Sequence, residues 1–337
     1  MREAMFYENA GGRRVRCVLC RFRCLIDEGG RGICAVRENR GGTLYTLVYG
    51  KTIAAHVDPI EKKPLYHVMP GSRTFSVATV GCNFRCLHCQ NYSISQPLQD
   101  TLRITGIDLP PEEIVTKALA SGCRSIAYTY TEPTIFFEYA YDTAVLAKKA
   151  GLKNVFVTNG YITPEALAMI SPFLDAANID LKSFSERFYR EVVHAKLKEV
   201  LDSIVEFRRQ GIWIELTTLI IPGWNDTDEE LRGIARFIAD KVGKETPWHV
   251  SRFHPTFKMI DRPSTPVATL ARARQIGLDA GLAYVYEGNT PEAEGENTMC
   301  PACGEILIRR SGFYMAENRI TEGKCPDCAA VIDGIDM

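Results

Sequence analysis

The sequence predicts an α/β fold in which parallel strands alternate with helices, and three clusters of cysteines mark its parts. Strand-like and helix-like runs alternate from Phe75 to Asn289. Regular alternation of this kind predicts a parallel sheet, open or closed into a barrel, with helices outside. Polar motifs follow the ends of the strand-like runs, which is where such folds place their chemistry. All cysteines except Cys123 fall in the three clusters.

The length and composition are those of an ordinary globular protein. At about 150 residues per domain, 337 residues allow two or three domains. A net charge of -1 gives no reason to expect general binding to nucleic acids. No run reaches the ~20 apolar residues of a membrane helix, and the first residues lack an apolar signal segment, so we expect a cytoplasmic protein. In that reducing compartment, clustered cysteines bind metal more often than they form disulfides.

Residues 1–72 are expected to form a cysteine-rich extension and a connector. The extension carries the spacing C-x2-C-x3-C-x9-C, made by Cys17, Cys20, Cys24 and Cys34. Four thiols with a glycine-rich turn suit one metal site, and zinc and an iron-sulfur cluster both fit the spacing. The connector, Asp58 to Gly71, is rich in proline and predicts no helix. It is either a packed linker or a segment beside the site.

Residues 73–290 are expected to form the α/β core. The strand-like runs are 75–80, 125–131, 154–158, 177–181, 213–221, 249–253 and 283–286, and the helix-like runs are 111–120, 134–150, 164–173, 186–209, 228–242 and 267–280.

The second cysteine cluster directly follows the first strand of this core. Cys82, Cys86 and Cys89 have the spacing C-x3-C-x2-C, and His88 is the only local candidate for a fourth ligand. Thiolate is the ligand of both zinc and iron-sulfur clusters, but a structural zinc site needs four protein ligands. Three cysteines on a cubane cluster would leave one iron open to hold a cofactor. The spacing therefore favours a cluster over a zinc knuckle.

Further polar motifs follow the later strands. They contain Thr129, Thr131, Glu132 and Pro133; Thr158, Asn159 and Gly160; Asn178, Asp180 and Lys182; Pro222 to Asp226; and Arg252 and His254. Each motif alone is weak, because Asn-Gly is a common turn and strand-end charges are often surface residues. Because the carboxyl ends of parallel strands share one edge, the motifs together predict a site there.

Residues 291–337 are expected to form a zinc-ribbon-like module. Two C-x2-C knuckles, Cys300 with Cys303 and Cys325 with Cys328, are separated by about twenty residues. A rubredoxin-like iron site is the alternative. So small a module needs metal for its stability, and it could also dock a partner.

The combined motifs resemble the radical S-adenosylmethionine (SAM) superfamily, near the activating enzymes of glycyl-radical proteins. The pattern CVLCRFRC...GICAVR, DPIEKKPLYH, GCNFRCLHCQN, YTYTEP, TNG, IDLK and CPACG...CPDC is similar to the radical enzymes of the AmmeMemoRadiSam system. The resemblance implies a partial, TIM-like barrel of six βα units with a 4Fe-4S cluster on Cys82, Cys86 and Cys89.

The resemblance also implies a cofactor site. SAM would chelate the open iron through its amino and carboxylate groups, with Thr131-Glu132-Pro133 near the amino group, Lys182 facing the carboxylate and Asp180 ordering that loop. Asn159 is expected to join these residues. Two positions depart from the family pattern. His88 stands where an aromatic residue usually lies against adenine, and Val157 replaces an acidic residue that helps to hold a cation in the activating enzymes.

The implied activity is reductive cleavage of SAM to a 5'-deoxyadenosyl radical, which takes hydrogen from a protein, a peptide or a small molecule. The electron would come from a donor such as flavodoxin or ferredoxin, and no catalytic residue is assigned. Activation of a glycyl-radical enzyme is one alternative. The other is a non-catalytic, metal-stapled scaffold that binds protein or RNA.

Overall fold

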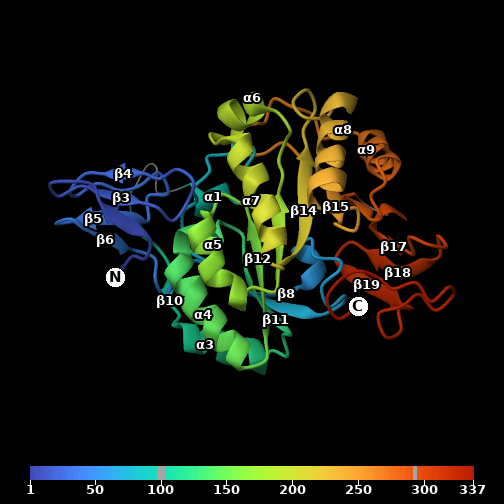
Figure 1. Ribbon diagram of the computed structural model, residues 1–337, viewed down its shortest axis with the longest axis horizontal. Coiled ribbons are helices and arrows are strands. Elements are labelled where there is room, and N and C mark those ends of the chain that lie inside the picture. Colours follow the sequence, from blue (N-terminus) through green and yellow to red (C-terminus); the bar gives the residue numbers. More distant parts are fainter. Residues whose placement is uncertain (97–102, 291–293) are drawn as a thin grey trace. The chain divides into compact units, whose positions relative to one another are not determined.

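The computed structural model describes residues 1–96, 103–290 and 294–337 (Figure 1). Contacts along the chain group these residues into two compact units. The first unit contains residues 1–58, 73–176 and 209–212, and the second contains 59–72, 177–208 and 213–337. Within the described ranges, no helix is long and apolar enough to cross a membrane. The expected boundaries at 72/73 and 290/291 stay predictions.

The first unit begins with small antiparallel sheets. Strands β1 (Arg2–Glu3), β6 (Thr43–Thr46) and β5 (Arg37–Arg40) form one, β2 (Tyr7–Asn9), β3 (Val15–Cys17) and β4 (Leu25–Ile26) form another, and β7 (Lys51–Thr52) pairs with β10 (Ile107–Asp108). The buried Arg37 guanidinium pairs with the buried carboxylate of Glu138 at 2.8 Å and also donates to the carbonyl oxygen of Met5. These contacts attach the extension to the helix that carries Glu138.

The α/β part of the first unit has the strand order β8-β9-β11-β12. Its elements are β8 (Ala54–Pro59), β9 (Arg73–Ala78), α1 (Tyr92–Ser95), α3 (Pro111–Ala120), β11 (Ser125–Tyr128), η2 (Pro133–Phe136), α4 (Phe137–Lys149), β12 (Lys153–Thr158), α5 (Pro164–Ile170) and η3 (Ser171–Phe173). Strand β11 is parallel to both β9 and β12, and each of its residues is buried, as in a sheet covered on both faces. Helices α3 and α4 lie side by side (Figure 1).

The second unit repeats this pattern with the strand order β13-β14-β15-β16. Its elements are η1 (Ile60–Lys62), β13 (Ala176–Asp180), α6 (Glu186–Phe188), η4 (Tyr189–Val193), α7 (Leu197–Arg209), β14 (Trp213–Ile220), α8 (Asp228–Phe237), η5 (Ile238–Val242), β15 (Trp248–Arg252), α9 (Val267–Asp279), β16 (Val285–Gly288), η6 (Glu294–Glu296), β17 (Thr298–Met299), β18 (Ile306–Ser311) and β19 (Tyr314–Asn318). Strand β15 is parallel to β14 and β16, so the predicted α/β class is confirmed. Strands β17, β18 and β19 form an antiparallel sheet at the end of the chain.

The single helix predicted over 186–209 is wrong, because the chain breaks at His194. This residue has a left-handed backbone with φ of 58°, and it separates η4 from α7. The Glu186 carboxylate accepts from the backbone N–H groups of Leu197 and Lys198 and so caps the second helix. Residues 186–209 contain no glycine or proline. The helical spacing of their apolar residues therefore continues across the break and predicts one helix.

The connector is packed against strands of the second unit around one buried carboxylate. Glu215 on β14 accepts from the backbone N–H groups of Tyr66 at 3.0 Å and His67 at 2.8 Å. Its carboxylate also lies 2.7 Å from Nε2 of His249 on β15. Burial by itself would raise the pKa of Glu215, but the His249 contact and the other hydrogen bonds hold it below its ordinary value.

The end of the chain is attached to the same connector. The Arg310 guanidinium, from β18, lies 4.2 Å from the centre of the Tyr66 ring and donates to the Tyr66 carbonyl oxygen at 3.0 Å. The backbone N–H of Ile335 donates to the carbonyl of His67, and Nδ1 of His67 lies 2.6 Å from the carbonyl oxygen of Asp333. These contacts tie the last forty residues of the chain, roughly, to its connector.

We expect Glu215→Ala to lower the free energy of unfolding by about 3 to 5 kcal/mol, because it leaves two buried N–H groups and His249 without their acceptor. Glu317→Ala is the control, since Glu317 pairs with Arg309 on an exposed surface and should cost less than about 0.5 kcal/mol. Anaerobic denaturant titration of both variants measures the difference. Equal midpoints would show that Glu215 does not hold the connector.

Candidate functional site

The central cysteines lie on a loop that leaves the carboxyl end of β9. The loop turns at Gly81, whose φ is 101°, and a Cβ at this position would come 2.8 Å from Cγ1 of Val36 and 3.1 Å from the carbonyl oxygen of Cys34. Only glycine combines this left-handed backbone with so close an approach. Gly81 therefore fixes the point at which the cysteine loop turns away from β9.

The loop thiols have partners that suit a thiolate. The backbone N–H of Phe84 and the amide of Asn159 both donate to the Cys82 sulfur, at 3.4 Å and 3.5 Å. The Cys89 sulfur lies 3.1 Å from Oγ of Ser95 on α1. Burial, followed by the nearby Glu132 carboxylate, raises the pKa of the Cys82 thiol well above its ordinary value. A thiolate at this position therefore needs a cation beside it, as a metal ligand has.

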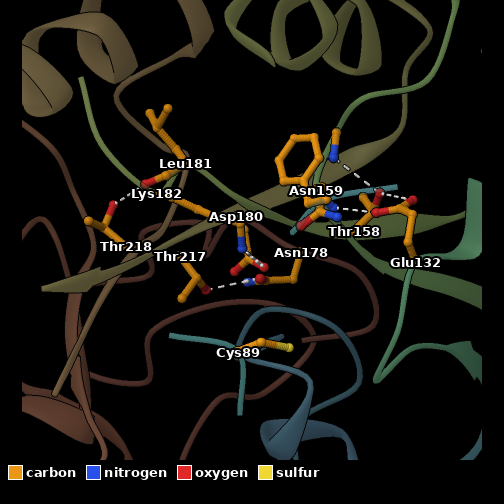
Figure 2. Close-up of polar contacts among 12 residues, drawn as sticks. Cys89, Glu132, Thr158, Asn159, Asn178, Asp180, Leu181, Lys182, Thr217 and Thr218 are labelled. Atoms are coloured by element: carbon orange, nitrogen blue, oxygen red, sulfur yellow. Dashed lines mark hydrogen bonds and ion pairs between the residues drawn. The ribbon is translucent and has the colours of Figure 1, made fainter. Parts of the chain in front are cut away.

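Glu132 organises the polar ends of β11 and β12. Its side chain is fully buried and accepts from the hydroxyl of Thr158 at 2.8 Å and the backbone N–H of Asn159 at 2.7 Å (Figure 2). It also accepts from the backbone N–H of Thr134 at 2.9 Å. Burial raises the pKa of this carboxyl, although the three hydrogen bonds oppose the shift. Two carboxylate oxygens offer about four acceptor positions, so one position is left for a ligand.

Asn159 connects this network to the cysteine loop. Its backbone is held by Glu132, and its side-chain amide donates to Oδ1 of Asn83 at 3.2 Å as well as to the Cys82 sulfur. Thr131 donates to the carbonyl of Thr79, which ties the motif after β11 to the residues that precede the loop. Hydrogen bonds thus link Glu132 through Asn159 to Cys82, and Thr131 to a residue that precedes the loop.

Asp180 and Lys182 form the corresponding site at the end of β13 in the second unit. Nζ of Lys182 lies 2.9 Å from Oδ2 of Asp180, and both side chains are partly buried (Figure 2). The backbone of Lys182 is fixed on both sides, because its N–H donates to the Tyr189 hydroxyl and its carbonyl accepts from Asn225 at 2.7 Å. The ion pair holds the Lys182 ammonium beside Asp180, and the expected role of Asp180 in ordering the loop stays a prediction.

Other predicted residues have structural partners. Asn178 donates to the carbonyl of Pro64 and accepts from Thr217, which keeps it within the sheet (Figure 2). Arg252 donates to the carbonyl of Thr265, and His254 is exposed beside Ser264. His88 is buried next to Cys89, and Pro133 opens the η2 turn.

The terminal cysteines converge on one point. The sulfurs of Cys300 and Cys328 are 3.6 Å apart, those of Cys303 and Cys325 are 3.7 Å apart, and all four lie within 4.8 Å of one another. Zinc-sulfur bonds of about 2.3 Å in a tetrahedron place sulfurs about 3.8 Å apart. These four side chains therefore fit a single metal ion, as predicted for a ribbon-like module.

The N-terminal cysteines also meet. Cys17, Cys20, Cys24 and Cys34 all line one pocket in the first unit. The pocket includes polar residues that the sequence analysis did not single out, namely Arg37, Asn83 and Thr134. Arg37 and Asn83 each stand within three residues of a cysteine in the sequence, and that proximity is the only signal that could have drawn attention to them.

Comparison with known proteins identifies relatives of this chain. Residues 76–238 match the radical SAM superfamily. An uncharacterized protein of Methanocaldococcus jannaschii is 47% identical over 335 residues, which cover 99% of each chain. A protein of the same organism named glycyl-radical enzyme activating enzyme is 28% identical over 61% of this chain and 78% of its own length. The pyruvate formate-lyase 1-activating enzyme of Escherichia coli strain K12 is 23% identical over 53% and 75%.

The fold has a counterpart among solved structures. Streptococcus suis SuiB, in its crystal structure bound to S-adenosylmethionine, aligns with 69% of this chain and 53% of its own, with a TM-score of 0.52 and 12% identity. This likeness concerns the fold alone, and it confirms the predicted barrel-type α/β architecture. The matched region, and not this likeness, shows that residues 76–238 form a radical SAM domain, and the named relatives show that the chain is related to glycyl-radical activating enzymes.

Proposed function

We propose that this chain cleaves SAM reductively at a 4Fe-4S cluster bound by Cys82, Cys86 and Cys89, and that the product radical takes hydrogen from a protein, peptide or small-molecule substrate. The observation that carries the proposal is the cysteine loop itself. It supplies three thiols at the carboxyl end of β9, and Asn159 bonds one of them from the end of β12. Three thiolates leave one cluster iron for the cofactor.

A 4Fe-4S cluster held by Cys82, Cys86 and Cys89 would supply the one-electron reduction of the SAM sulfonium, the chemistry that releases methionine and a 5'-deoxyadenosyl radical. The chain's own residues orient and protect this chemistry. Donation from Asn159 and Phe84 stabilises the thiolate of Cys82. The buried Glu132 holds Asn159 in place and keeps one acceptor position for the cofactor's amino group.

Lys182 is proposed to bind the cofactor's carboxylate. Its ammonium is held by Asp180 and its backbone by Tyr189 and Asn225, so little side-chain freedom is lost on binding. His88 is proposed to stack on adenine, as the aromatic residue does in the family pattern. The electron donor is proposed to be flavodoxin or ferredoxin.

Activation of a glycyl-radical enzyme is the second candidate function. It is favoured by the names of two relatives, one a glycyl-radical enzyme activating enzyme and the other an activating enzyme of pyruvate formate-lyase. In that case the hydrogen would come from a backbone glycine of a partner protein. Incubation with a candidate partner, followed by EPR detection of a glycyl radical, separates this function from action on a small molecule.

We expect the triple variant Cys82→Ala, Cys86→Ala and Cys89→Ala to lose all SAM cleavage, because no thiolate remains to hold the cluster beside the cofactor. Anaerobic assays with dithionite and mass spectrometry of 5'-deoxyadenosine measure the loss. Cys123→Ala is the control, since Cys123 is also buried but lies outside the three clusters. Cleavage by the triple variant at the rate of the control would end the proposal.

We expect Lys182→Ala to weaken SAM binding roughly 10- to 100-fold. A lost charge-assisted hydrogen bond costs about 1.5 to 3 kcal/mol, and 1.4 kcal/mol corresponds to a factor of ten. Lys153→Ala is the matched control, because Lys153 pairs with Asp175 at 3.0 Å at the opposite end of its strand from the TNG motif. Anaerobic calorimetry measures both affinities. Equal affinities, or a lower melting temperature with unchanged affinity in Lys182→Ala, would assign Lys182 a structural role.

A further inference from the structure

The N-terminal cysteine pocket is lined by four thiols and by apolar side chains. Its lining contains the four thiols together with Leu19, Phe22, Ile26, Ile33 and Ile135. The four thiols come from β3 and the two turns that follow it, and the backbone N–H of Cys17 donates to the carbonyl of Cys24 at 2.9 Å, which closes the first turn. Such an arrangement holds the four thiols, which are buried or partly buried, around one pocket, as a metal or cluster site requires.

Three buried donor groups on the same pocket have no hydrogen-bond partner among the described residues. They are Nε of Arg37, Nδ2 of Asn83 and Oγ1 of Thr134, on side chains that are no more than 2% exposed. A buried polar group without a partner costs about 1 to 3 kcal/mol. Three of them around one pocket indicate an occupant that offers acceptors on several sides. The inorganic sulfides of an iron-sulfur cluster are such acceptors, whereas a zinc ion would add no acceptor beyond the four thiolates themselves.

The spacing of the thiols also separates this pocket from the terminal metal site. Within residues 1–96, 103–290 and 294–337, only the terminal cysteines form a group whose ligand atoms all lie within 4.8 Å of one another. Neither the N-terminal four nor Cys82, Cys86 and Cys89 form one. Cysteines that bind different irons of a cluster stand farther apart than cysteines that share one ion. Among the described residues, the N-terminal thiols are therefore not gathered around one point as the terminal thiols are.

The pocket borders the loop of the central cysteines. Asn83, which lines the pocket, directly follows Cys82, and its Oδ1 accepts from Asn159. The Arg85 guanidinium donates to the carbonyl of Ile33 at 3.2 Å, beside Cys34. A group held in the pocket would thus lie against a residue of the central loop.

We propose that Cys17, Cys20, Cys24 and Cys34 bind a second 4Fe-4S cluster, with Arg37, Asn83 and Thr134 donating hydrogen bonds to its sulfides. Four thiolates ligate every iron, so this cluster has no open position for SAM or a substrate. Its place beside the loop 81–89 suits the exchange of single electrons with the central cluster, the electron coming from a low-potential one-electron carrier. Only this last role rests on the proposed function.

Metal analysis of the full chain, reconstituted anaerobically, tests the proposal. We expect about eight irons and one zinc in the wild type, and about four irons with an unchanged zinc content in the Cys82→Ala, Cys86→Ala, Cys89→Ala variant. Adding Cys20→Ser and Cys34→Ser to that variant should remove the remaining iron. In contrast, Cys303→Ser with Cys328→Ser should remove zinc and leave iron unchanged.

Two results would overturn the proposal. If the triple variant contains two zinc ions and no iron, the N-terminal pocket is a zinc site. If the triple variant contains one zinc ion and no iron, the N-terminal pocket binds no metal. Neither result bears on SAM cleavage by the wild type, whereas cleavage by the triple variant would count against the proposed function and leave this cluster unaffected.

If the cysteine variants do not fold, a substitution of a pocket residue that is not a cysteine still tests the proposal. Thr134→Val removes one donor with little change of shape, so we expect full iron content in the triple-variant background but a more negative reduction potential of the remaining cluster. Ser125→Ala is the control, because the Ser125 hydroxyl is also buried without a partner but does not line the pocket. Equal potentials in the two variants would show that Thr134 does not contact the cluster.

Discussion

The carboxylate of Glu132 is the contact on which the candidate site of the first unit depends. It is the shared acceptor for the residues that follow β11 and β12, and through Asn159 it reaches the sulfur of Cys82. A buried carboxylate is costly unless several donors surround it. Because those donors are backbone N–H groups and a threonine hydroxyl, the arrangement fixes two loops at once. The cysteine loop thereby rests on the ends of neighbouring strands and not on its own turns alone.

The second unit uses the same device for a different purpose. Glu215 collects two backbone N–H groups and His249, but it binds the connector instead of a strand-end motif. In both cases one buried negative charge joins segments that are distant in sequence. In the first unit, Glu132 holds residues of the candidate site. In the second unit, Glu215 holds the connector against the sheet.

The cysteine spacings and the alternation of strand-like and helix-like runs predicted those features that depend only on residues close together in the sequence. Each of these features can be recognised from a stretch of about ten residues: the C-x3-C-x2-C loop, the two later knuckles and the strand-end motifs. Parallel pairing then brings the strand-end motifs of each unit to one edge of the sheet. The break at His194 was missed, since it depends on the cap that Glu186 provides from eleven residues away. Arg37, Asn83 and Thr134 were missed because only folding brings them to one pocket. The packed state of the connector likewise depends on Glu215, nearly 150 residues further along the chain.

The attachment of the terminal residues to the connector has a consequence for how this chain can change over evolutionary time. Arg310 covers the ring of Tyr66, Ile335 bonds to His67, and Met315 occupies the space that a side chain at Gly71 would need. A lineage that lost the terminal cysteines and their segment would expose an aromatic ring and leave backbone groups without partners. Such a loss would persist only with compensating replacements between residues 59 and 72. The connector and the ribbon-like module are therefore expected to be inherited, or lost, together.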